Sequence, residues 1–136
     1  MDFLKSISIA ASGLRAQAGR MRVIAENIAN ADSTAKTAGA DPYRRKIPTF
    51  QTEIDRSLNA RVVTMGRLKT DQSEFQLKYQ PGHPAADASG NVKYPNVNGL
   101  VEMTDMREAQ RSYEANINVI GATRRMIQRT LDILKA

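Results

Sequence analysis

Apolar residues recur in alternating steps of three and four at both ends of the chain, and the middle shows no such pattern. Near the N-terminus, all eight positions of the row are apolar: Leu4, Ile7, Ala11, Leu14, Ala18, Met21, Ala25 and Ile28. Near the C-terminus, two polar residues interrupt the row: Met103, Met106, Gln110, Tyr113, Ile117, Ile120, Arg124, Ile127, Leu131 and Leu134. This spacing keeps one side of a helix turned toward a partner helix. The pattern predicts that the two terminal helices pair in a coiled coil and that the protein acts by assembly.

A second apolar row runs beside the first on each helix. Its members repeat every seven residues: Ile9, Ala16 and Val23 on the first helix, and Val119, Met126 and Ile133 on the second. A helix that is apolar on more than one side is normally buried by several neighbours. Two helices of one chain cannot supply those neighbours, so we expect copies of the chain or homologous subunits to do so.

Turn and cap signals bound the two helices. The first is expected from Phe3 to Asn30, and the second begins near Asn98, a good N-cap residue. A helix of about 35 residues is about 50 Å long. A compact chain of 136 residues has a diameter of roughly 35–40 Å, so we expect an elongated molecule.

The middle of the chain carries short strand-like segments between turns. Strands are expected near Ile47–Thr52, Arg61–Leu68, Glu74–Tyr79 and Val92–Tyr94. The predicted fold is therefore mainly α. It has a discontinuous helical domain, residues 1–30 and 99–136, with residues 31–98 as a loop and small β-rich insert between its halves.

Four residues in the helices have two interpretations each. Gly13 and Gly19 either let a neighbouring backbone approach closely or simply weaken the first helix, at about 1 kcal/mol each relative to alanine. Gln110 and Arg124 either fix the register of the helix pair or reach solvent where the row drifts. The sequence alone leaves both pairs of alternatives open.

Composition excludes several classes of function. The net charge of +6 is spread along the chain, which disfavours a nucleic-acid-binding protein. Cysteine is absent, so disulfides and thiolate chemistry are excluded. His83 is the only histidine and lies in a loop, so we predict no catalytic residue, metal site or cofactor. The N-terminus lacks a signal-peptide pattern and no stretch suits a transmembrane helix, so we expect no direct membrane insertion.

Three consecutive cations, Arg44, Arg45 and Lys46, precede the first expected strand. Such a run either binds a phosphate or an acidic partner, or forms a solvated strand edge. We expect these side chains to lie on the surface, where they are candidates for a contact with a neighbouring subunit.

The sequence resembles the bacterial flagellar axial proteins, and most closely the proximal-rod proteins of the FlgC type. The resemblance rests on Ala11–Gln17 and Val23–Asn30 in the first helix, and on Pro42–Lys46 after it. It continues through Tyr94–Asn98 into the second helix. Motif positions carried over from the family are Asn27, Asn30, Pro95, Asn96, Asn98 and Asn116.

The resemblance implies a structural, non-enzymatic subunit of the rod that crosses the periplasm between the membrane ring and the distal rod and hook. Its implied partners are other rod subunits and copies of itself, with the flagellar type III export apparatus met in transit. It also implies export without a cleaved signal peptide, and helical stacking of the terminal helices around an axial channel. The alternative from the heptads alone is a cytoplasmic coiled-coil adapter or chaperone.

Overall fold

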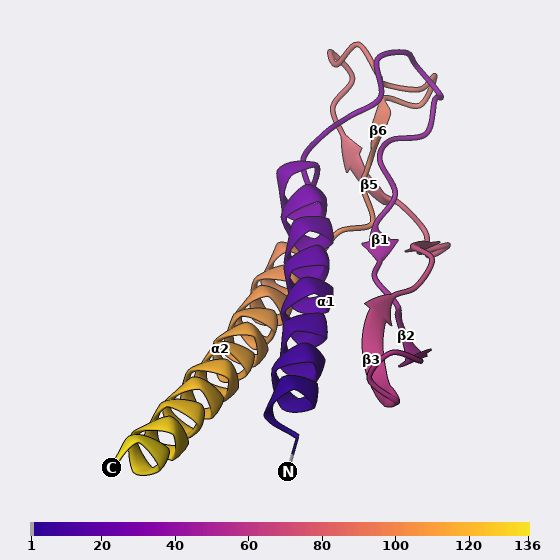
Figure 1. Cartoon of the computed structure of the whole chain (residues 1–136). Coiled ribbons are helices and arrows are strands. Elements are labelled where there is room, and N and C mark those ends of the chain that lie inside the picture. The colour runs from indigo at the N-terminus through magenta and orange to yellow at the C-terminus, as the bar shows by residue number, and fades with distance from the viewer. Residues whose placement is uncertain (1) are drawn as a thin grey trace. The chain divides into compact units, whose positions relative to one another are not determined.

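A computed structural model describes residues 2–136 (Figure 1). The chain contains two long helices, α1 (Phe3–Ala29) and α2 (Gly99–Lys135). Six short strands lie between them in the sequence. Helices thus account for most of the ordered backbone, and the strands all fall in the segment between them. The predicted fold class, mainly α with a β-rich insert, is confirmed.

The strands form three separate two-stranded antiparallel sheets, β1–β4, β2–β3 and β5–β6. The sequence predicted the regions of these strands, but it merged the first two into one segment and missed the fourth. The strands are β1 (Lys46–Ile47), β2 (Phe50–Asp55), β3 (Ala60–Met65), β4 (Lys69–Thr70), β5 (Gln76–Tyr79) and β6 (Asn91–Tyr94).

The chain divides into two compact units that cut across the helix-and-insert division predicted above. The first unit contains residues 1–21, 49–67 and 107–136. The second unit contains residues 22–48 and 68–106. Each unit therefore includes part of both helices and part of the middle of the chain, and each is described separately below.

Side-chain caps explain where both helices begin. The Asp2 carboxylate accepts hydrogen bonds from the backbone N–H groups of Leu4 and Lys5, at 3.1 and 3.2 Å. Asn98 does the same at the start of α2, where its Oδ1 accepts from the N–H of Leu100 at 3.0 Å. These bonds satisfy amide groups that have no partner inside the helix.

In the first unit, α1 and α2 pack in antiparallel directions. Gly13 of α1 lies against Asn116 of α2, and a Cβ atom added at Gly13 would lie 3.0 Å from the Asn116 amide. Arg20, seven residues further along α1, forms an ion pair of 3.3 Å with Glu108, eight residues earlier in α2. The missing side chain at Gly13 thus permits a close helix–helix contact.

The β2–β3 hairpin packs on another side of α1 in the same unit. Ser12 Oγ accepts a hydrogen bond from the backbone N–H of Val63 in β3, at 3.2 Å. A Cβ atom added at Gly19 would lie only 1.9 Å from Met65 Sδ, so the Met65 side chain would have to move before a larger residue could be accommodated there. Both glycines thus lie against a side chain of another element, Asn116 for Gly13 and Met65 for Gly19.

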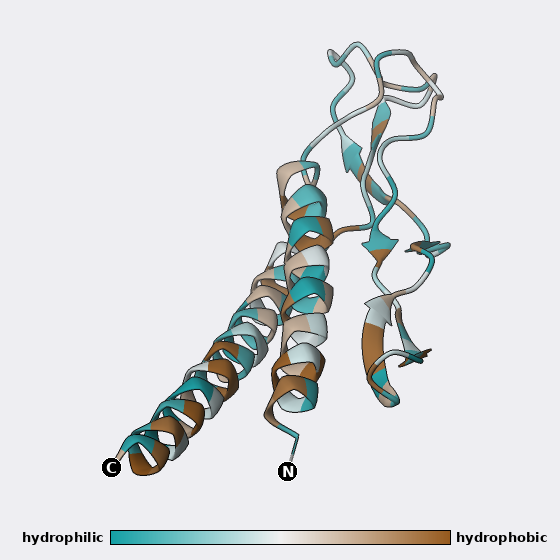
Figure 2. Cartoon of the chain, viewed as in Figure 1, coloured by the Kyte–Doolittle hydropathy of each residue, from teal (hydrophilic) through white to brown (hydrophobic). Residues whose placement is uncertain are grey.

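Small side chains dominate the buried apolar core. Its members are Ala10, Ala16, Val23, Ile24, Ala60, Ala85, Val92, Val97 and Ala109. Many larger apolar side chains are exposed, among them Ile117, Leu131 and Leu134 of α2. Figure 2 shows hydrophobic residues, in brown, recurring along the C-terminal half of this helix. The chain therefore buries little apolar area per residue by itself.

Candidate assembly surfaces

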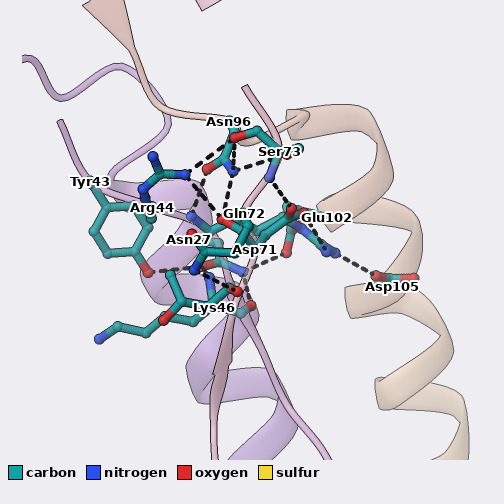
Figure 3. A network of polar contacts seen from close by, with 12 residues as sticks. Asn27, Tyr43, Arg44, Lys46, Asp71, Gln72, Ser73, Asn96, Glu102 and Asp105 are labelled. Atoms are coloured by element: carbon teal, nitrogen blue, oxygen red, sulfur yellow. Dashed lines mark hydrogen bonds and ion pairs between the residues drawn. The ribbon is translucent and has the colours of Figure 1, made fainter. Parts of the chain in front are cut away.

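Asn27 is the centre of a polar network in the second unit (Figure 3). Its side chain is fully buried and makes four hydrogen bonds. Its Nδ2 donates to Lys46 O at 2.8 Å and to Glu102 Oε2 at 3.1 Å. Its Oδ1 accepts from Lys46 N at 2.9 Å and from the Tyr43 hydroxyl at 2.8 Å. One amide side chain therefore binds β1 and α2 to α1, with its full bonding capacity in use.

Asn96 holds the loop before α2 in a similar way. Its Oδ1 accepts a hydrogen bond from Arg45 N at 2.8 Å. Its Nδ2 is within hydrogen-bonding distance of Asp71 O at 3.1 Å, and of Ser73 O and Oγ at 3.2 and 3.0 Å. These contacts substitute for sheet pairing where the strands are too short to supply it.

Arg45 provides the positive charge of the network. Its Nε donates to Glu102, whose side chain is fully buried. Its two terminal nitrogens lie 3.8 Å from Asp71 and 3.6 Å from Asp105. Because a buried carboxylate is stable only when it is paired and hydrogen-bonded, Glu102 depends on both Arg45 and Asn27.

The three cations at 44–46 therefore contact the chain itself. Arg44 donates to Asp71 O and Ser73 O, and its guanidinium lies 4.1 Å from the centre of the Phe75 ring. Lys46 forms an ion pair with Glu26. These contacts correct the expectation of a free surface run, because a three-residue charge cluster carries no signal of partners so distant in the sequence.

Burial raises the pKa of Tyr43 to about 12, and the negative charges of Glu26 and Glu102 act in the same direction. In the unfolded chain this phenol loses its proton near its ordinary pKa of 10.0. The unfolded state thus binds fewer protons than the folded state between these values, so stability falls as pH rises.

We therefore expect the melting temperature of the protein to fall between pH 10 and 12. Tyr43→Phe has no phenol to ionise, so its melting temperature should fall less over the same range. Circular dichroism melts of both proteins at half-unit pH steps measure the difference. Parallel slopes would contradict this role of Tyr43.

The α2 residues that pack against the rest of the chain are not those of the predicted apolar row, which starts at Met103. They form a row of buried or half-buried small and polar residues: Glu102, Ala109, Asn116 and Thr123. Four of the ten members of the predicted row are half-buried beside it: Met106, Tyr113, Ile120 and Ile127. The other six are exposed: Met103, Gln110, Ile117, Arg124, Leu131 and Leu134. Gln110 and Arg124 are exposed to solvent in this chain.

On α1 the predicted row is also only partly covered. Half-buried members are Ile7, Ala11, Leu14 and Met21, and exposed members are Leu4, Ala18, Ala25 and Ile28. The second row splits similarly. Ala16 and Val23 are buried, whereas Ile9, Val119, Met126 and Ile133 are exposed. The exposed members of both rows are the candidates for contacts with other subunits.

The comparison with known families follows the same two helices. A family described as flagella basal body rod protein matches residues 7–35. A family described as flagellar basal body rod FlgEFG protein C-terminal matches residues 88–133. Asn27 lies in the first matched segment and its partner Glu102 in the second, so the network joins the two segments.

Curated relatives match over their full length. Flagellar basal-body rod protein FlgC of Agrobacterium fabrum is 53% identical, over 100% of this chain and 99% of that protein. This chain belongs to the FlgC family of flagellar basal-body rod proteins. FlgC of Salmonella typhimurium is 40% identical over 98% of both proteins, and FlgC of Bacillus subtilis is 37% identical over 99% of this chain and 100% of that protein.

The FlgC-type motif residues named from the sequence have distinct structural positions. Asn27, Asn96 and Pro95 lie in or beside the network, and Pro95 is fully buried. Asn98 caps α2, as predicted. Asn30 Nδ2 donates to Glu26 O at 2.9 Å, and Asn116 Nδ2 donates to Ser112 O at 3.0 Å.

Sequence reasoning missed three members of the network: Tyr43, Asp71 and Glu102. Glu102 lies near the start of the second helix. Its position seven residues before Ala109 places it in the buried row, which is the signal that could have found it. Asp71 is 26 residues after Arg45 in the sequence, and no local pattern connects the two.

Two further observations concern chemistry and membranes. Within residues 2–136, no group of three or more His, Cys, Asp and Glu side chains is arranged to hold a metal ion. Neither helix in this range has the long apolar stretch that crossing a bilayer requires.

Proposed function

We propose that this chain is a structural, non-enzymatic subunit of the proximal rod of the bacterial flagellum. It assembles with other rod subunits and with copies of itself, in the periplasmic part of the basal body. It reaches that place through the flagellar type III export apparatus without a cleaved signal peptide. Membership of the FlgC family supports this proposal over a cytoplasmic adapter or chaperone.

The observation that carries the proposal is the exposed apolar surface of the helices. Ile117, Val119 and Met126 of α2 are 46%, 48% and 42% exposed, and Ile133 is 75% exposed. Recurring large apolar side chains of this kind mark surfaces that bind other proteins. We assign the predicted assembly rows, in their exposed members, to contacts with neighbouring subunits.

Ile117→Asp tests this assignment. Ile117 is nearly half-exposed, so the substitution should change the stability of the isolated chain by about 0.5 kcal/mol or less. In the assembly it would bury an unpaired carboxylate, which costs several kcal/mol. We expect normal secretion but loss of motility and of the protein from purified basal bodies, in a strain lacking its own copy.

Asn118→Asp is the matched control, because this neighbouring residue is exposed and polar. It should restore motility to the same strain. Ile120 is a poorer target because it is half-buried within the chain itself, so its substitution would also disturb the fold. Wild-type motility of Ile117→Asp would exclude this row from the assembly contacts, and failure of the unaltered chain to restore motility would contradict the proposed function.

A further inference from the structure

The outer edge of β2 carries main-chain groups that have no hydrogen-bond partner within residues 2–136. Thr52 lies opposite Val63, and the Val63 N–H points away from β2 to Ser12. In an antiparallel ladder, both residues of such a pair turn their N–H and C=O groups outward. Phe50, Thr52 and Ile54 therefore present these groups on the open edge of the hairpin.

The outer edge of β5 is open in the same way. Gln80 N donates to Gly90 O at 2.8 Å, which fixes the alternation of the β5–β6 ladder. Leu77 and Tyr79 consequently turn their N–H and C=O groups away from β6. Their side chains are 62% and 72% exposed.

The opposite edge of each hairpin is bound in part by the chain's own groups. On β3 the Val63 N–H is bound by Ser12, and on β6 the Asn91 carbonyl accepts from Asp87 N at 2.9 Å. Proteins usually protect open edges with lysine, proline or a covering segment. β2 contains neither lysine nor proline, and its first five residues are exposed. An extended strand is the partner that such an edge binds best.

We propose that β2 of one copy of this chain pairs in antiparallel fashion with β5 of a second copy. In one register of β2 against β5, the opposing residues are compatible in charge, in polarity and in the direction of their main-chain groups. It sets Glu53 opposite Lys78, Ile54 opposite Leu77, and Thr52 opposite Tyr79. The outward main-chain groups of the last two pairs then bond each other, and the first pair joins opposite charges.

This pairing joins different surfaces of the two copies, so each copy retains one free edge for the next. Contacts of this kind join more than two copies, in a closed ring or in an open helical filament. The inference rests on the proposed assembly function and adds to it a specific contact. The alternative, two β2 edges pairing symmetrically, would stop at a dimer.

Because the natural chain contains no cysteine, Glu53→Cys with Lys78→Cys introduces the only thiols. Residues in a non-hydrogen-bonded antiparallel pair have Cα atoms about 4.5 Å apart, within the range of a disulfide. The full-length double variant is expressed as the sole copy, and its basal bodies are isolated and oxidised. We expect a ladder of covalent oligomers on a non-reducing gel that disappears on reduction.

Controls fix the register and the partner. Gln51→Cys with Lys78→Cys tests the neighbouring register and should give at least fivefold less ladder. Thr52→Cys alone tests symmetric β2 pairing and should give no dimer. A stronger signal from either control, a disulfide closed within one chain, or incorporated double variant without a ladder would overturn the proposal.

Charge exchange provides a second measurement that needs no oxidation. Glu53→Lys and Lys78→Glu should each reduce recovery in basal bodies severalfold, and the double exchange should restore most of it. Failure of the double exchange to exceed either single variant, with secretion intact in all three, would contradict the pairing. Motility restored by the unaltered chain tests the proposed function separately, whatever the outcome for these variants.

Discussion

Asn27→Asp is expected to destabilise the protein by about 3 kcal/mol or more, which corresponds to a fall in melting temperature of about 10 °C. The substitution replaces the two N–H donors that serve Lys46 O and Glu102 with an acceptor. It also sets a second negative charge beside the fully buried Glu102 carboxylate. A buried acceptor without a donor and two adjacent carboxylates are both costly.

Asn30→Asp is the matched control for this substitution. Asn30 lies just beyond the same helix, is only half-buried, and donates to a single carbonyl, that of Glu26. Its replacement should cost about 1 kcal/mol. Thermal melts followed by circular dichroism compare the two variants, and equal melting temperatures would contradict the central role of Asn27.

Gly19→Ala is expected to destabilise the first unit by about 1–3 kcal/mol, the usual cost of overpacking. Alanine favours a helix by about 1 kcal/mol over glycine. Here that gain is outweighed, because the new Cβ would lie 1.9 Å from Met65 Sδ. Met65 must then leave its place against α1.

Gly121→Ala provides the opposite expectation in the other helix. A Cβ at Gly121 would lie 3.5 Å from Arg125 Nη1, an ordinary contact, so this variant should be stabilised by up to about 1 kcal/mol. Combining Gly19→Ala with Met65→Ala should cost less than the sum of the two single changes. Urea denaturation measures all four variants, and strict additivity would mean that Gly19 and Met65 do not compete for the same space.

The sequence predicted the helices and most strands because periodicity and caps are local signals. The 3.5-residue repeat requires only the residues of one helix, and Asn98 caps the very residues that follow it. The register of the helix pair is not a local signal, because it depends on the side chains of the partner helix. Gly13 leaves room for Asn116, and this polar row packs inward while the apolar row beside it stays exposed.

The network could not be derived from the sequence for a related reason. The resemblance to a known family singled out Asn27 and Asn96, but not what they bind. The partners of Arg45 are Asp71, Glu102 and Asp105, which are distant in the chain and unremarkable in their local surroundings. Only the folded structure shows that Arg45, a member of the charged run 44–46, neutralises the buried carboxylate of Glu102.

The alanine-rich core has a consequence for copies that find no neighbour. Within residues 2–136, five of the nine buried apolar residues are alanines, whereas Leu131, Ile133 and Leu134 are exposed. Folding stability that comes largely from partners depends on their concentration. A surplus copy would therefore unfold often and be degraded by cellular proteases, while an incorporated copy would be protected. The supply of subunits would then follow the number of growing structures without a dedicated regulator.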